Sequence, residues 1–183
     1  MKFAVAIDVQ NDFIDGSLGC DKNREITGKI VEAINGGRFN DHTLFATMDT
    51  HYANYLETKE GEKLPVEHCV YLTEGWKLAD GLKDKVDPNN VILKGTFGSG
   101  ALVQTIGNEV TKRMSENSSP EEKVEIELFG FCLSICVISN ALLLKAAFPN
   151  ADIRVIGNLC GDVDEESRQA AIKVLKNCQI DFI

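Results

Sequence analysis

The chain has 183 residues, of which 44% are hydrophobic and 26% charged, and its formal net charge is -9. This length and apolar content suffice for a hydrophobic core, and we expect one domain over residues 1–183. The negative charge argues against partners such as nucleic acids or an anionic membrane surface. No segment approaches the ~20 apolar residues of a membrane helix, and the apolar run that ends at Asp8 is too short for a signal peptide. The six cysteines include no C-x-x-C pair, which predicts a reduced, cytoplasmic protein.

Strand-like and helix-like segments alternate along the chain, which is typical of an α/β fold with a mostly parallel sheet. Short apolar runs predict strands at 3–8, 43–48, 91–94, 124–129, 153–156 and 179–182. Longer runs predict helices at 25–34, 101–114, 135–148 and 164–176. Loops are expected at 51–76 and 115–122. The first of these loops is long enough to indicate a functional role.

Polar or reactive side chains stand where several predicted strands end. Asp8, Asp49 and Lys94 end or follow three strands, and the turn from Gly130 to Cys136 follows a fourth. In open parallel sheets, ligands bind beyond the carboxyl ends of the strands. These residues therefore predict a site at one edge of the sheet.

Cys136 is the strongest candidate for a reactive group. It lies between a buried-strand pattern that ends in Gly130 and an apolar run, 137–147, that predicts a helix. The positive end of a helix dipole favours a thiolate, and Asp8 and Lys94 supply a base and a cation at the same edge. The alternative is an inert, buried helix cysteine. The combination of the three residues favours an enzyme.

Four separated segments carry recognisable motifs. They are DVQNDF at 8–13, DTH at 49–51 followed by His68, KGTF at 94–97, and GFCLSICV at 130–137. In this order they resemble the motifs of the isochorismatase-like cysteine hydrolases, a family that includes the nicotinamidases. The resemblance covers most of the chain and implies a three-layer α/β/α fold with a doubly wound, mostly parallel sheet of about six strands.

The resemblance implies a role for each member of the strand-end group. Cys136 would attack a carbonyl carbon and form a thioester with loss of an amine. Asp8 would accept the thiol proton, pass it to the departing nitrogen and then activate water. Lys94 would act as counter-ion and lower the pKa of Cys136.

The resemblance also implies an oxyanion hole made by the backbone N–H groups of Cys132 and Cys136. The family places a cis peptide bond before the first of these, which here joins Phe131 to Cys132. This chain has Leu133 and Ser134 where the family usually has Thr-Asp. That departure removes a carboxylate from the turn.

A metal site is implied by the DTH motif. Asp49 and His51 are two residues apart at a strand end, so their side chains leave the same face. His68 would join them from the long loop, and Glu57 is the fourth expected ligand. Zinc suits these ligands, as do iron and manganese. The alternative is that the first two residues are only a turn pair.

Aromatic residues indicate where a flat substrate would lie. Phe13, Phe97 and Phe131 are expected to line an apolar slot, with plain core packing as the alternative. Nicotinamidases often carry a tryptophan just before the second metal histidine. Here the only tryptophan, Trp76, follows His68 instead.

The leading hypothesis is a metal-dependent amidohydrolase that converts nicotinamide to nicotinate and ammonia in NAD salvage. One alternative is a cysteine hydrolase acting on another small amide, such as a carbamoyl or ureido compound. Another is a non-catalytic binding protein that keeps the fold. Isochorismate hydrolysis fits less well, because that chemistry belongs to members without the cysteine. The expected partner is a small-molecule amide. The sequence does not decide whether the chain forms a homo-oligomer.

Overall fold

Six strands form one parallel sheet in the computed structural model, which describes residues 1–116 and 123–183. The order across the sheet is β3-β2-β1-β4-β5-β6. The strands are β1 (Lys2–Ile7), β2 (Thr43–Asp49), β3 (Val91–Lys94), β4 (Glu125–Gly130), β5 (Asp152–Cys160) and β6 (Asp181–Phe182). The chain runs outward from β1 to β3, then returns to the other side of β1 with β4. This doubly wound order places a switch point between β1 and β4, where such folds bind ligands.

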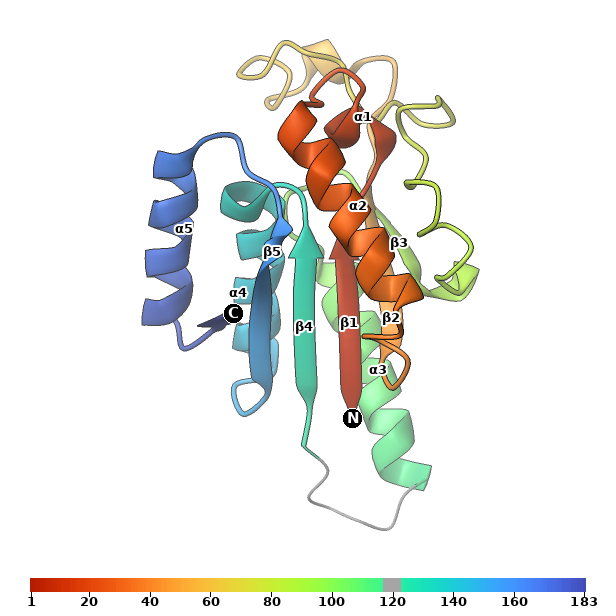
Figure 1. The fold of residues 1–183 in the computed structure, drawn as a ribbon, viewed down its shortest axis with the longest axis vertical. Coiled ribbons are helices and arrows are strands. Elements are labelled where there is room, and N and C mark those ends of the chain that lie inside the picture. The colour runs from red at the N-terminus through yellow and green to blue at the C-terminus, as the bar shows by residue number, and fades with distance from the viewer. Residues whose placement is uncertain (117–122) are drawn as a thin grey trace.

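Helices cover both faces of the sheet. They are α1 (Asn11–Ile14), α2 (Asp21–Asn35), α3 (Gly100–Glu116), α4 (Ile138–Ala147) and α5 (Glu165–Asn177). In Figure 1, α2 lies in front of the sheet and α3 and α4 lie behind it, with α5 packed beside α4. The predicted α/β/α fold with a doubly wound sheet is therefore confirmed. No helix within the described residues is both long and apolar enough to cross a membrane.

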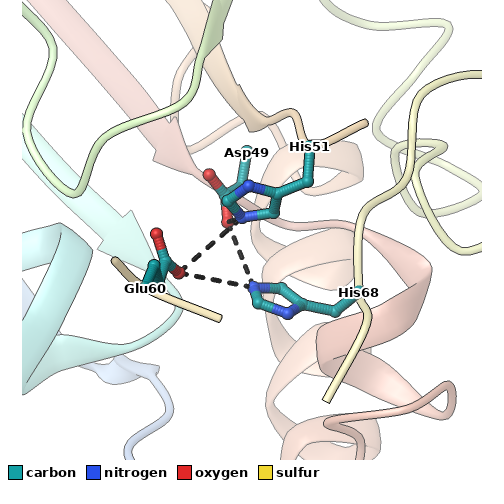
Figure 2. Close-up of side chains that lie close together, drawn as sticks. All are labelled: Asp49, His51, Glu60 and His68. Carbon is teal, nitrogen blue, oxygen red and sulfur yellow. Dashed lines mark hydrogen bonds and ion pairs between the residues drawn. The ribbon is translucent and has the colours of Figure 1, made fainter. Parts of the chain in front are cut away.

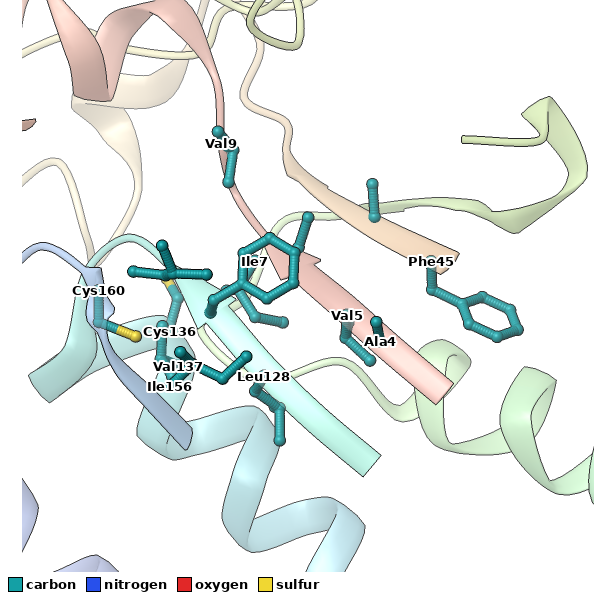
Figure 3. Packing of buried hydrophobic residues seen from close by; sticks show 14 of the residues in the cluster. Ala4, Val5, Ile7, Val9, Phe45, Leu128, Cys136, Val137, Ile156 and Cys160 are labelled. Atoms are coloured by element: carbon teal, nitrogen blue, oxygen red, sulfur yellow. The ribbon is translucent and has the colours of Figure 1, made fainter. Parts of the chain in front are cut away.

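The central strands are apolar because both of their faces are covered. All of β1 from Phe3 to Ile7 is fully buried. Figure 3 shows Ile7 of β1 and Leu128 of β4 in one cluster with Val137, which belongs to the helical turn η3 (Leu133–Val137). The hydrophobic core therefore extends to the turn that carries Cys136.

The structure departs from the predicted elements in a few places. The four-residue helix α1 was not predicted, and the helix expected at 135–148 begins with the π-helical turn η3 before α4. Helix α3 extends to Glu116, so the first two residues of the loop expected at 115–122 are helical. The rest of that loop lies outside the described residues. Two short 3-10 helices, η1 (Tyr55–Glu57) and η2 (Pro88–Asn90), lie between β2 and β3.

Candidate active site and metal centre

The carboxyl ends of four adjacent strands meet at the edge of the sheet near α1. Asp8 follows β1, Asp49 ends β2, Lys94 ends β3, and Cys136 lies in η3 just after β4. Asp8 has a φ of +50°, which is uncommon outside glycine, at the point where the chain leaves the sheet. The strand order thus brings together residues that are far apart in the sequence.

Lys94 is the centre of the predicted catalytic group. Its Nζ lies 2.7 Å from Oδ2 of Asp8 and 3.6 Å from Sγ of Cys136. The same nitrogen lies 3.5 Å from Oδ1 of Asp49. Thr47 donates a hydrogen bond of 2.7 Å from Oγ1 to Oδ1 of Asp8. All of these side chains are buried, so the structure holds a base, a cation and a thiol in contact and away from water.

Burial governs the proton equilibria of this group. It raises the pKa of Asp8, and the attraction of Lys94 only partly offsets the effect. Burial opposes the charge of Lys94, but Asp8, Cys136 and Asp49 outweigh it and keep the pKa of this lysine above its ordinary value.

Lys94 lowers the pKa of Cys136 as expected, but other effects outweigh its contribution. Burial, reinforced by the negative charge of Asp8, raises the pKa of this thiol well above its ordinary value although Lys94 opposes the shift. Two of the amides that open η3 already have acceptors elsewhere. Leu133 donates to the carbonyl of Gly161, and Ser134 donates to the carboxylate of Asp162. A raised thiol pKa disfavours the free thiolate, so attack by Cys136 calls for a base close to its sulfur.

The turn before Cys136 has the backbone that the sequence resemblance implied. The peptide bond between Phe131 and Cys132 is cis. Gly130 has a φ of +126°, and a Cβ there would lie 2.0 Å from the carbonyl oxygen of Ile7. Only glycine fits this position. The backbone N–H groups of Cys132 and Cys136 stay the predicted oxyanion donors.

Four side chains next to this group converge on one point. Asp49, His51, His68 and Glu60 place a carboxylate oxygen or an imidazole nitrogen within 4.8 Å of one another, and Figure 2 shows them facing each other. Oδ2 of Asp49 lies 3.0 Å from Nε2 of His51 and 3.4 Å from Nε2 of His68. Its other oxygen faces Lys94, so Asp49 joins this cluster to the catalytic group.

The donor set fits a divalent cation. Nδ1 of His68 lies 2.8 Å from the carbonyl oxygen of Val66, so it carries the proton in the neutral ring. Nε2 then presents a lone pair toward the carboxylate oxygens of Asp49 and Glu60. Lone pairs that converge in this way suit a cation, and two imidazoles with two carboxylates are suitable ligands for zinc.

The acidic residue from the loop is Glu60, and the prediction of Glu57 is not supported by its placement. Glu57 ends the short helix η1 and its side chain is exposed. Three residues later, Oε1 of Glu60 lies 3.7 Å from His51 and 3.8 Å from His68. Cys69, next in sequence to a histidine of the cluster, is buried but does not join it.

A cavity of about 290 Å³ opens onto both groups of residues. Its wall includes Cys136, Asp49 and His68, together with Phe13 and Phe97. The lining residues are otherwise largely apolar, as expected for a small-molecule site.

Phe131 is not part of the cavity lining, contrary to prediction. It is fully buried and packs against Gly161, where a Cβ would lie 2.6 Å from its ring. Trp76 also lies outside the cavity lining in the described residues, and its Nε1 donates instead to Thr50.

Gln10 was not predicted as a site residue, although it belongs to the DVQNDF motif. Its Nε2 donates to the carbonyl oxygens of Asp49 (2.9 Å) and Trp76 (2.7 Å). Its Oε1 accepts from the backbone N–H of Asp49 at 2.7 Å. A buried glutamine thus ties the segment after β1, the end of β2 and the long loop together, and its place in the motif two residues after Asp8 was the available signal.

Comparison with known proteins identifies the class to which this fold and site belong. A model of the Isochorismatase domain matches residues 3–183. The chain belongs to the isochorismatase family. No curated protein matches it by sequence.

Solved structures share the fold over the whole chain. A zinc complex of Pyrococcus horikoshii pyrazinamidase is 19% identical, with a TM-score of 0.75, and the match covers 100% of this chain and 98% of that chain. A Bacillus subtilis nicotinamidase/pyrazinamidase is 24% identical, with a TM-score of 0.73 and coverage of 100% and 99%. An L. infantum structure in complex with nicotinate is 18% identical, with a TM-score of 0.77 and coverage of 100% and 92%.

Proposed function

We propose that this protein is a metal-dependent amidohydrolase that converts nicotinamide to nicotinate and ammonia in cytoplasmic NAD salvage. The observation that carries this proposal is the link through Asp49. One of its oxygens faces Lys94 of the catalytic group, and the other faces the histidines of the metal cluster. Both groups open onto one cavity with aromatic side chains in its wall. Structural neighbours that are nicotinamidases support the same assignment.

The first half of the reaction forms a thioester. Asp8 takes the proton of the Cys136 thiol, and the sulfur attacks the amide carbon. The backbone N–H groups of Cys132 and Cys136 hold the oxyanion, while Lys94 offsets the negative charge. Asp8 then gives its proton to the amide nitrogen, the C–N bond breaks, and ammonia leaves.

The second half releases the acid. Asp8, again a carboxylate, takes a proton from water as the oxygen attacks the thioester carbon. The C–S bond breaks, and Asp8 returns the proton to the sulfur of Cys136. The raised pKa of Asp8 suits both directions of transfer, because the carboxyl must accept and release a proton in turn.

Asp49, His51, His68 and Glu60 would hold the metal ion, with Zn²⁺ favoured over Fe²⁺ or Mn²⁺. When bound there, the ion would supply Lewis acidity toward the pyridine nitrogen of nicotinamide, which makes the amide carbon more electrophilic. Phe13 and Phe97 would hold the flat ring between apolar surfaces.

The test is ammonia release from nicotinamide and, in parallel, from a ureido compound, with zinc-loaded and chelator-treated protein. We expect turnover of nicotinamide that is lost on chelation and restored by zinc. Cys178→Ala should retain activity, because Cys178 follows α5 away from the cavity, whereas Cys136→Ala should abolish it. Turnover of the ureido compound alone, or turnover that needs no metal, would overturn the proposal.

A further inference from the structure

The segment that follows β5 fixes the turn that carries Cys136. The backbone N–H of Leu133 donates to the carbonyl of Gly161 at 2.8 Å. The backbone N–H of Ser134 donates to Oδ2 of Asp162 at 3.1 Å, and its Oγ donates to Oδ1 at 2.5 Å. Three hydrogen bonds therefore join the two residues at the start of η3 to two residues beyond a neighbouring strand.

Both carboxylate oxygens of Asp162 accept hydrogen bonds in this contact. Asp162 is 8% exposed, and its Oδ1 also accepts from the backbone N–H of Val163 at 2.9 Å. A buried carboxylate is tolerated when donors surround it, and a negative charge at the start of a helical segment stabilises that segment. The turn has Ser134 where the family usually has an aspartate. Asp162 supplies a carboxylate at this place from a distant part of the chain.

The position of this contact matters for the chemistry. Leu133 and Ser134 lie between Cys132 and Cys136, whose N–H groups are the proposed oxyanion donors. Fixing two of the three intervening residues restrains the two donors relative to each other. It also fixes Sγ of Cys136 at 3.6 Å from Nζ of Lys94.

We propose that Asp162, acting through Ser134, is the positioning residue of the nucleophile turn. This inference rests on the proposed function, because it concerns the same cysteine chemistry. Asp162 makes no covalent or proton-transfer step itself. It holds the turn in the geometry that attack requires, and errors of about 1 Å in such geometry cost about a hundredfold in rate.

The test is a double-mutant cycle of Asp162→Asn and Ser134→Ala in the zinc-loaded enzyme. We expect Asp162→Asn to lower kcat by about ten- to a hundredfold while KM changes by less than about twofold. Ser134→Thr, which keeps the hydroxyl, should restore most of the activity that Ser134→Ala loses. The double variant should be no worse than Asp162→Asn alone, because the two side chains act as one unit. Additive losses, or a loss confined to KM, would overturn the proposal.

Two matched controls separate positioning from general stability. Asp164→Asn removes an exposed carboxylate two residues away that caps α5 through the N–H of Ser167. Ser115→Ala removes a hydroxyl that donates to the carbonyl of Lys112 in α3, away from the site. Both should keep kcat within about twofold of wild type. If Asp164→Asn lowers kcat as much as Asp162→Asn, the proposal fails.

Alkylation of Cys136 by iodoacetamide, measured by peptide mass spectrometry, keeps this test independent of the substrate. Releasing the turn exposes a thiol that is 5% exposed, so Asp162→Asn should alkylate severalfold faster than wild type or Asp164→Asn. Faster alkylation in a protein that does not hydrolyse nicotinamide would refute the proposed function and keep the inference. An unchanged alkylation rate in Asp162→Asn would refute the inference.

Discussion

Replacing Gln10 by leucine removes three hydrogen bonds from a buried position while keeping the side chain similar in size. The change leaves the backbone N–H and carbonyl of Asp49, and the carbonyl of Trp76, without their partner. Each buried polar group left unsatisfied costs about 1–3 kcal/mol, and Trp76 is only half-buried. We therefore expect the free energy of unfolding to fall by about 3–5 kcal/mol.

Urea unfolding of the chelator-treated protein measures this loss without a contribution from bound metal. The single tryptophan, Trp76, reports directly on the affected loop. Gln169→Leu is the matched control, because Gln169 is exposed on α5 and its side chain donates to Glu165 in the same helix. It should change stability by less than about 0.5 kcal/mol. A loss below about 1 kcal/mol for Gln10→Leu would refute the idea that this glutamine ties the loop to the sheet.

Three further predictions concern the site. Glu60→Gln should weaken zinc binding by at least about tenfold, whereas Glu57→Gln should leave it unchanged. Competition with a chelating dye measures both affinities. Equal effects of the two variants would contradict the assignment of Glu60 as the ligand. Thr47→Val removes a hydrogen bond that lowers the pKa of Asp8. The acidic limb of the kcat/KM profile should then move to higher pH, and a shift to lower pH would exclude Asp8 as the base. Phe131→Ala should lower the free energy of unfolding by about 3–5 kcal/mol. Phe97→Ala should raise KM for nicotinamide with little change in urea unfolding. The reverse pattern would contradict the assignment of Phe97 to the cavity wall and of Phe131 to the core.

The sheet and its site edge follow from the sequence because they depend on short-range patterns. A buried parallel strand is an apolar run that ends where polar residues resume, so Asp8, Asp49 and Lys94 mark three strand ends directly. Parallel strands share one carboxyl edge, which places these residues together without any knowledge of the loops. The position of Cys136 after a fourth strand follows in the same way.

The remaining details depend on long-range packing that no local pattern encodes. Glu57 and Glu60 stand three residues apart in a loop with little regular structure, and the path of the folded loop places Glu60 beside the histidines. Phe131 lies in a cavity-facing motif but packs against Gly161, which is distant in sequence. The raised pKa of Cys136 follows mainly from its burial, which outweighs the attraction of Lys94.

The most direct measurement of the central claim is trapping of the thioester with hydroxylamine during turnover of nicotinamide. A nicotinoyl group carried on Cys136 should transfer to hydroxylamine and yield nicotinohydroxamate at the expense of nicotinate. We predict this product with the zinc-loaded wild type and its absence with Cys136→Ala. Nicotinate without hydroxamate would show direct attack by water and contradict the cysteine mechanism. The absence of both products would contradict nicotinamide as the substrate.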